Sequence, residues 1–274
     1  MSRISDAFAG GKAFIPFFTC GDPDLDTTGR LVRTAVEAGA DLIELGIPFS
    51  DPTAEGPVIQ AANVRALAGG VTTDRIFDFV RELRKDVTVP IVFMTYANVV
   101  YSYGMTSSAR MRGSGAEQNG IAAFAARCAE AGADGLILPD VPFEEKEEFR
   151  AVFGQYGLPL ISMIAPTSEN RIAEISEEAE GFLYVVSSLG VTGVRSEITT
   201  DIGGMLRLVR QHTGIPCAVG FGISTPEQAS EMAALSDGAI VGSAIMRLVG
   251  EYGRESVEPV RALVRGMAAA VHGV

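Results

Sequence analysis

Short apolar runs alternate along the chain with longer segments in which apolar residues recur at helical spacing. Most of the short runs are apolar at every position, which is typical of parallel strands covered on both faces. This pattern predicts eight strands, at residues 14–19, 42–46, 91–96, 135–138, 160–164, 182–187, 217–220 and 239–242.

The segments between these strands predict helices at 25–38, 58–85 in two pieces, 121–131, 144–156, 170–179, 201–211, 226–234 and 257–271. Eight strand–helix units in 274 residues favour an α/β fold of the (β/α)8 TIM-barrel type over an open, doubly wound sheet. We expect one barrel domain over residues 1–274, with a short additional helix at 4–8 under the barrel floor.

Internal repeats support a fold built from repeated units. The sequence EAGADLIELG from Glu37 is echoed by EAGADGLILPD from Glu130 and more loosely by SDGAIVGS from Ser236. Each echo has the pattern of a helix end, a turn and a strand. Gly39 and Gly132 stand where a helix C-cap requires a positive φ.

Residues 105–120 (MTSSARMRGSGAEQNG) interrupt this rhythm. The segment is rich in Ser and Gly and is longer than the few residues that usually connect a strand to a helix. We expect an inserted, mobile βα loop. It is either an inert surface insertion or a lid or partner contact, because βα loops lie on the functional face of a barrel.

Composition narrows the partners and the compartment. Lys and Arg number 22 against 34 Asp and Glu, and a net charge of −12 disfavours nucleic acid and anionic membranes. No apolar run is long enough to span a bilayer, and the start MSRISDAFAGGK lacks a signal peptide's apolar core, so we expect a cytoplasmic protein. Cys20, Cys128 and Cys217 are far apart among apolar neighbours, which indicates buried thiols in a reducing compartment.

Candidate acid–base residues gather after the second strand. In a (β/α)8 barrel the site is built from the carboxyl ends of the strands. Glu44 lies in the apolar strand LIELG, and if its face is the interior one, loss of water raises its pKa toward neutrality, as suits a general acid. Asp51 and Glu55 follow in the loop 47–57, and Asp140 ends the fourth strand. The alternatives are a structural glutamate and solvated loop charges.

Three glycine-bearing turns follow the last three strands: GVTG at 190–193, GFGIS at 220–224 and GSAI at 242–245. Their backbone N–H groups can approach an oxyanion closely, and Ser243 would open the last helix, whose positive dipole end favours anions. The turns after strands seven and eight form the usual phosphate site of this barrel. Alternatively they are only tight strand–helix turns.

Residue types required by other chemistries are scarce. The lysines, Lys12, Lys85 and Lys146, do not end a strand, which disfavours a Schiff-base aldolase. His212 and His272 lie near a helix end and in the tail, which disfavours a His-ligated metal site or a catalytic triad. No dinucleotide or nucleoside triphosphate motif is present. The residues favour carboxylate acid–base catalysis on a phosphorylated substrate, without a metal.

The segment LIELGIPFSDPTAEGPVIQ (42–60) resembles the tryptophan synthase alpha chain family, and so do PFFTCGDP, MTYANVV, PDVPFEE, SSLGVTG, GFGIS and GSAI around it in the same order. The resemblance implies a (β/α)8 barrel that cleaves indole-3-glycerol phosphate to indole and glyceraldehyde 3-phosphate by a retro-aldol step. It also implies a beta-chain partner that carries pyridoxal phosphate, an α2β2 assembly, and no cofactor in this chain.

The resemblance also assigns roles. Glu44 matches the family's acid–base glutamate, and Glu55 stands where the family has an aspartate that contacts the indole N–H. The extra methylene moves that carboxylate by about an ångström, enough to slow cleavage unless the loop readjusts. The other matches are the indole pocket (Phe17, Met94, Tyr96, Ile164 and Tyr184), a mobile-loop threonine (Thr192), the phosphate site (Gly193, Gly222, Gly242 and Ser243) and the beta-chain contacts (Pro48, Asp51 and Asn98).

Two other functions stay open at this point. Glu55 and the insertion at 105–120 are compatible with a catalytically weak regulatory subunit that activates the beta chain. The glycine turns would also fit another phosphate-binding isomerase or lyase on the same barrel.

Overall fold

The computed structural model describes residues 3–104, 116–166, 169–187, 201–220 and 222–274. Two of the predicted site residues, Thr192 and Gly193, lie outside these ranges, and so does most of the predicted loop at 105–120.

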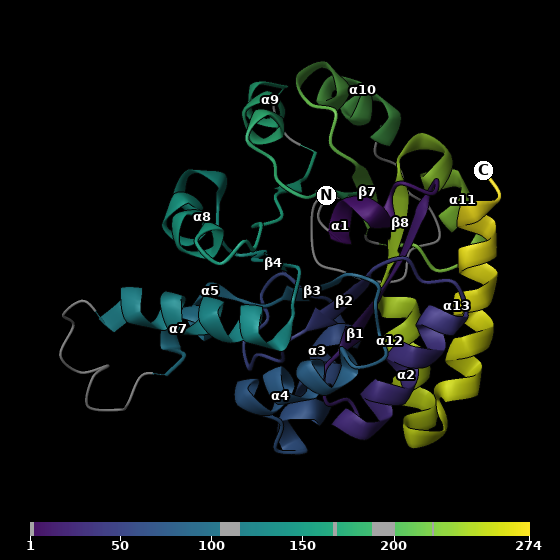
Figure 1. Ribbon diagram of the computed structural model, residues 1–274. Helices are drawn as coiled ribbons and strands as arrows, with labels where there is room; N and C mark the ends of the chain where they lie inside the picture. Colours follow the sequence, from purple (N-terminus) through teal and green to yellow (C-terminus); the bar gives the residue numbers. More distant parts are fainter. Residues whose placement is uncertain (1–2, 105–115, 167–168, 188–200, 221) are drawn as a thin grey trace.

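Eight parallel strands form one sheet in the order β4-β3-β2-β1-β8-β7-β6-β5 (Figure 1). A parallel bridge between Leu136 and Leu160 joins β4 to the segment before β5 and closes the barrel. The predicted (β/α)8 fold is confirmed. The strands are β1 Ala13–Thr19, β2 Ile43–Gly46, β3 Ile91–Met94, β4 Gly135–Ile137, β5 Met163–Ile164, β6 Leu183–Val186, β7 Cys217–Gly220 and β8 Gly238–Val241.

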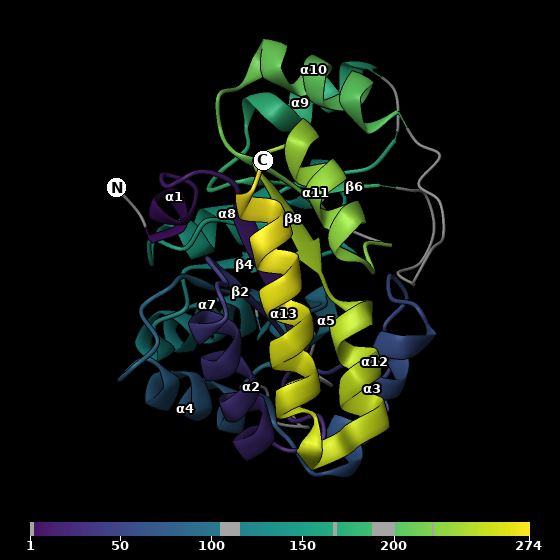
Figure 2. The same ribbon diagram turned by 90° about the vertical axis from the view of Figure 1, so that its right-hand side faces the viewer.

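Helices surround the sheet, and the C-terminal helix runs alongside α2 and α11 (Figures 1 and 2). The α-helices of the described residues are α1 Arg3–Ala7, α2 Leu25–Glu37, α3 Pro57–Ala68, α4 Thr73–Leu83, α5 Ala97–Ser102, α7 Ala116–Ala131, α8 Glu147–Gly154, α9 Glu169–Glu177, α10 Ile202–His212, α11 Pro226–Leu235, α12 Ser243–Tyr252 and α13 Val257–His272; two 3-10 turns are η1 Phe143–Glu145 and η2 Gly253–Glu255.

The loop predicted at 105–120 is too long, because α7 begins at Ala116. The first residues of α7 are Ala, Glu and Gln, which are good helix formers. The prediction extended the loop through these residues because of the glycine at 120. A Cβ built on Gly120 would lie 2.2 Å from the carbonyl oxygen of Tyr101. Gly120 therefore lets α7 pack closely on α5 and does not mark a loop.

Two helices differ from the prediction. The sequence predicts no helix at α5, a short element. Ser243 does open a helix, but the segment after β8 holds two helices, α12 and α13. Gly253, with a φ of 54°, ends α12 and turns the chain into η2 before α13 begins. The predicted break within 58–85 is confirmed by the separation of α3 from α4.

The helix α1 lies across the barrel floor, as predicted. Ile4 is fully buried, and its Cδ1 atom packs beside Gly135 at the start of β4 and Gly181 just before β6. Phe8 follows the helix, with its ring 5.7 Å from that of Phe182. The amino ends of the strands are thereby closed, which leaves the carboxyl ends as the open face of the barrel.

The helix α3 is fixed to the rim of the barrel by an ion pair. Asp22 follows β1 and its side chain has no exposed surface, while Arg65 of α3 donates to both carboxylate oxygens at 2.8 and 2.7 Å. A bidentate pair of this kind sets geometry as well as energy. It positions the segment between β2 and α3 over the carboxyl ends of the strands.

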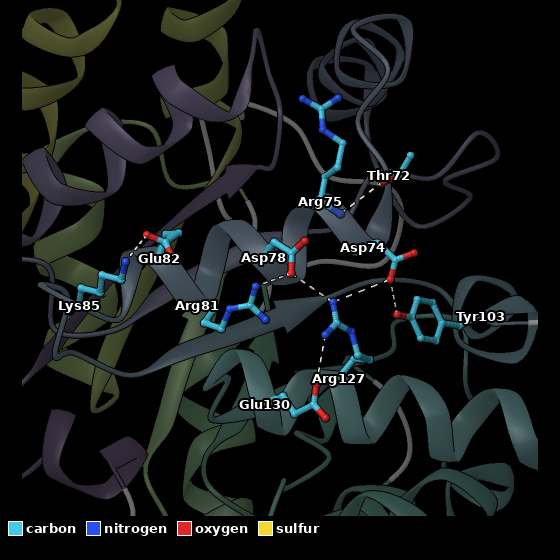
Figure 3. A network of polar contacts seen from close by, with 10 residues as sticks. All are labelled: Thr72, Asp74, Arg75, Asp78, Arg81, Glu82, Lys85, Tyr103, Arg127 and Glu130. Atoms are coloured by element: carbon cyan, nitrogen blue, oxygen red, sulfur yellow. Dashed lines mark hydrogen bonds and ion pairs between the residues drawn. The ribbon is translucent and has the colours of Figure 1, made fainter.

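A network of exposed polar side chains joins α4 to α7 (Figure 3). Arg127 of α7 forms ion pairs with Asp78 at 3.3 Å and with Glu130 at 3.1 Å, and its guanidinium lies 5.7 Å from the centre of the Phe77 ring. The hydroxyl of Tyr103 donates to Asp74 at the start of α4. These contacts hold the elements on either side of residues 105–115.

The internal repeats have a structural basis at the floor. In each repeat an aspartate just before a strand accepts a hydrogen bond from the backbone N–H of the neighbouring strand and lies beside a basic side chain. The groups are Asp41 with Phe14 N at 2.7 Å and His272, Asp134 with Ile91 N at 2.8 Å and Arg84, and Asp237 with Cys217 N at 2.7 Å and Arg210. The predicted positive φ at Gly39 and Gly132 is also confirmed, at 108° and 84°.

The contacts of these aspartates predict that replacing one of them lowers the stability of the fold. Asp134→Ala leaves the Ile91 N–H without its acceptor and the Arg84 guanidinium, 12% exposed, without its counter-charge. We expect the free energy of unfolding in urea at pH 7 to fall by about 3 kcal/mol. The control is Glu82→Ala, which removes an exposed ion pair with Lys85 and should cost no more than about 0.5 kcal/mol. Equal losses in the two variants would contradict this role of Asp134.

Candidate active site

A cavity opens at the carboxyl ends of the strands. Its wall is mainly apolar, with acidic side chains from β2 and the loop after it, and with glycine turns after β7 and β8. The lining residues are Phe17, Glu44, Ala54, Glu55, Ile59, Met94, Pro139, Met163, Tyr184, Gly222, Ile223, Ile240, Gly242 and Ser243.

Glu44 projects from the inner face of β2 into this cavity. It stands level with Phe17 in the β1–β2 register, and only 1% of its surface is exposed. Its Oε2 atom is buried and has no hydrogen-bond partner among the described residues. Burial, together with repulsion from Glu55, raises the pKa of Glu44 to about 8. The side chain therefore carries a proton at neutral pH.

Glu55 reaches the same cavity from the loop between β2 and α3. Its side chain is 7% exposed, and Oε2 accepts a hydrogen bond of 2.7 Å from Nδ2 of Asn63 on α3. Burial raises the pKa of Glu55 to about 7, and the hydrogen bond from Asn63 partly offsets this rise. Its pKa remains below that of Glu44, so Glu55 loses its proton first.

The two carboxyl groups together define the chemistry of this end of the cavity. At neutral pH one can donate a proton while the other places negative charge beside a ligand. Among the described residues, neither carboxyl group forms an ion pair with Lys or Arg. Also within these residues, no three His, Cys, Asp or Glu side chains come together as a metal site.

Aromatic and sulfur-containing side chains form the walls. The Phe17 ring lies over Gly46, where a Cβ would approach its Cζ atom to 2.6 Å, and Tyr184 lies similarly over Gly220, with 2.5 Å to its hydroxyl oxygen. The two glycines thus make room for flat side chains, and Met94 completes this apolar slot. Such a slot suits a planar ring system.

Backbone groups form the part of the cavity wall that follows β7 and β8. Gly242 is the N-cap of α12, no side chain caps it, and Ser243 begins the helix. Gly222 lies nearby in the lining, with a φ of 81°. Free N–H groups and the helix dipole at this point can bind an anion such as a phosphate group without lysine or arginine.

The other predicted residues take different places. Ile164 is fully buried and Tyr96 is 2% exposed, and neither is part of the lining, although the Tyr96 hydroxyl accepts a hydrogen bond of 3.1 Å from Ala54 N. Asp51 and Asn98 are exposed, whereas Pro48 is buried.

Asp140, a candidate from the sequence, does not line the cavity. Its two carboxylate oxygens each accept from the backbone N–H of Ala97 at 3.1 Å, so it caps α5.

Asn63 escaped the sequence analysis. A polar residue within the apolar stripe Ile59, Ala62 and Ala66 of α3 was the available signal.

The barrel and its cavity define a (β/α)8 protein whose two buried carboxyl groups suit acid–base chemistry. Residues 5–272 match the family model of the tryptophan synthase alpha chain. The alpha chain of Lacticaseibacillus casei is 43% identical over 271 residues, covering 99% of this chain and 96% of the relative. That of Caldanaerobacter subterraneus is 46% identical, covering 96% and 97%.

Solved structures agree with these relatives. Tryptophan synthase subunit alpha from Legionella pneumophila has a TM-score of 0.85 at 36% identity, with 100% of both chains covered. A Mycobacterium tuberculosis tryptophan synthase has a TM-score of 0.84 at 32% identity, covering 99% and 98%. The chain belongs to the tryptophan synthase alpha chain family, whose role in tryptophan biosynthesis is the retro-aldol lyase cleavage that releases indole.

The raised pKa of Glu44 predicts a pH-dependent stability. An unfolded glutamate ionises near its ordinary pKa of 4.5, whereas the folded one keeps its proton until about pH 8. Folding is therefore penalised increasingly as pH rises through this window. Relative to wild type, Glu44→Gln should gain about 1 kcal/mol or more in unfolding free energy between pH 5 and pH 8. Urea denaturation at both pH values tests this, and a pH-independent difference would contradict the buried proton.

Proposed function

We propose that this chain cleaves indole-3-glycerol phosphate, with Glu44 as the acid–base catalyst and Glu55 as the carboxylate that stabilises positive charge on the indole ring. One observation supports this most strongly. Two buried carboxyl groups with raised pKa values line the same apolar cavity as the start of α12, which no side chain caps. One cavity thus offers both acid–base groups and a site for an anion.

Glu44 gives up one proton and takes one back in the course of the reaction. Protonated Glu44 delivers its proton to indole C3, and the ring nitrogen takes up the positive charge beside Glu55. Glu44 then accepts the proton of the hydroxyl on the carbon attached to C3. That hydroxyl becomes the aldehyde carbonyl as the carbon–carbon bond breaks, and the bond's electron pair returns to the ring. Indole and glyceraldehyde 3-phosphate leave, and Glu44 carries a proton again.

Binding is divided along the cavity. Phe17, Met94 and Tyr184 would enclose the indole ring, with Tyr96 and Ile164 supporting the wall from behind. Gly222, Gly242 and Ser243 would bind the phosphate through backbone N–H groups and a hydroxyl. We assign Gly193 to the phosphate and Thr192 to positioning Glu44, on the family motif alone.

Glu55 is compatible with this role despite its extra methylene. The side chain lies in the cavity wall and is held there by Asn63, so the longer arm is accommodated. We therefore prefer a competent lyase to a catalytically weak regulatory subunit.

Partner, cofactor and location complete the proposal. A tryptophan synthase complex from Pyrococcus furiosus is among the similar solved structures. We propose that this chain docks a beta chain through Pro48, Asp51 and Asn98 in an α2β2 assembly. The beta chain would carry pyridoxal phosphate, this chain no cofactor. We further propose a cytoplasmic location. In the part of the chain that the structure describes, no helix has both the length and the apolar composition needed to span a membrane.

Turnover by Glu44→Gln tests the proposal. Glutamine keeps the shape but cannot shuttle a proton, so indole release should fall about 1000-fold or more. The dissociation constant of the uncleavable analogue indole-3-propanol phosphate should change less than about threefold. The control is Glu82→Gln on the outer face of α4, which should keep wild-type turnover.

Indole release is measured with and without a beta chain. Full turnover by Glu44→Gln would remove Glu44 from the mechanism. Negligible turnover by the wild type under both conditions would contradict the lyase, and stimulation of the beta chain in that case would favour the regulatory subunit. Restoration of cleavage by Glu55→Asp would then trace the defect to position 55.

A further inference from the structure

We propose that Asn63 is a positioning residue that holds the Glu55 carboxylate ionised and in place, and thereby keeps the proton on Glu44. This inference deepens the proposed function and rests on it. Asn63 is not in the cavity lining, so it would act on the reaction through Glu55 and without contacting the substrate.

Asn63 and the cavity meet the Glu55 side chain from different sides. Nδ2 of Asn63 donates to Oε2 at 2.7 Å from behind the cavity wall, while Glu55 itself lines the cavity. A carboxamide N–H is a donor only, so in this arrangement it stabilises the anionic form of the acid more than the neutral form. Asn63 is 4% exposed, and a donor with so little access to water is worth more than one at the surface.

The main chain of Glu55 is held independently. Its carbonyl oxygen accepts a hydrogen bond of 2.8 Å from Nε2 of Gln60, and its N–H donates to Pro52 O at 3.2 Å. Loss of the Asn63 amide would therefore leave the backbone of Glu55 fixed and change only the position and charge of its carboxylate.

The charges around Glu55 make this one hydrogen bond important. Among the described residues, the titratable groups that interact with Glu55 are Glu44 on β2 and Tyr96 after β3, and Tyr96 also senses Asp140. Tyr184 on β6 faces Glu44 from the opposite wall. None of these groups carries a positive charge, so none of them offsets the burial that favours protonation of Glu55. The hydrogen bond from the Asn63 amide does offset it in part.

The effect passes from Glu55 to Glu44 by charge repulsion. An ionised Glu55 is the second cause, after burial, of the raised pKa of Glu44. Without the Asn63 donor, Glu55 would take up a proton at neutral pH, and the repulsion that helps to keep Glu44 protonated would weaken. The order in which the two groups titrate would be lost together with the charge beside the indole nitrogen.

The test is Asn63→Leu, which keeps the approximate size of the side chain and removes the donor. The acidic limb of the kcat/KM profile, which reports ionised Glu55, should move up by about one pH unit, a tenfold change in its ionisation constant. At pH 7 the ionised fraction of Glu55 falls from about a half to about a tenth, so kcat should fall about fivefold while KM stays within about threefold. Carbon-13 NMR of glutamate carboxyl groups, assigned with Glu55→Gln, should show the same shift without substrate.

Two further variants distinguish the proposed role of Asn63 from a purely structural one. Asn63→Asp places a third acid beside Glu55 and should move the limb in the same direction if Asn63→Leu does not fold. The double change Asn63→Gln with Glu55→Asp moves one methylene from the acid to the amide and should return the titration to within about 0.3 pH units of wild type. The control Val64→Leu, on the exposed side of α3, should leave both titration and turnover unchanged.

Unchanged carboxyl titrations in folded Asn63→Leu and Asn63→Asp would overturn the proposal, even if both variants lose stability. A downward shift would also overturn it, because it would mean that Asn63 accepts from a protonated Glu55. Absence of indole release by the wild type would overturn the proposed function instead, because the NMR titration examines Asn63 without turnover.

Discussion

The burial of one carboxyl group on the inner face of β2 is the constraint on which the site depends. Glu44 is almost completely buried, and no described cavity residue is a lysine or arginine that could favour its ionised form. The proton is therefore retained at neutral pH. An anion site made of backbone N–H groups is consistent with this requirement, since a phosphate-binding lysine in the same cavity would lower the pKa of both acids.

Stability and chemistry occupy opposite ends of the barrel. At the floor, each repeated aspartate joins the start of a neighbouring strand to a basic side chain, and α1 covers the strand ends. At the rim, Glu44 and Glu55 have no basic partner among the described residues, and the packing of the sheet below offsets the cost of burying them. Gly46 and Gly220 are the last residues of β2 and β7. Because they have no side chains, they leave room for Phe17 and Tyr184 to line the cavity.

The sequence predicted the fold well because its signals are local. Continuously apolar strands, helix C-cap glycines at 39 and 132, and eight repeats of the same unit are each determined by neighbours in the chain. The errors arose from contacts between distant segments. Glycine is common in loops, but Gly120 lies in α7, where the lack of a side chain leaves room for the carbonyl of Tyr101. Asp140 follows a strand, as a catalytic acid of a barrel would, but it accepts from the first residue of α5. The expectation of one domain over residues 1–274 stays a prediction.

The candidate site was only partly accessible from the sequence. Glu44 and the turns at Gly222 and Gly242 were found because they lie within a strand or just after one, and the parallel sheet brings the carboxyl ends of its strands to one rim. Phe17 was assigned from the resemblance to the family. Asn63 was missed because its contact with Glu55 spans two turns of α3 and depends on how that helix is docked by Arg65 and Asp22. Apolar spacing along a helix identifies its buried face but not the partner of a polar residue within it.

The most direct test of the central claim is the protonation state of Glu44 itself, observed by infrared difference spectroscopy between wild type and Glu44→Gln as pH is varied. The account predicts a protonated carboxyl band at pH 7 that disappears with a midpoint near pH 8. A carboxylate band that is already complete at pH 6 would mean that the barrel interior does not hold the proton, and the account of the site would be wrong.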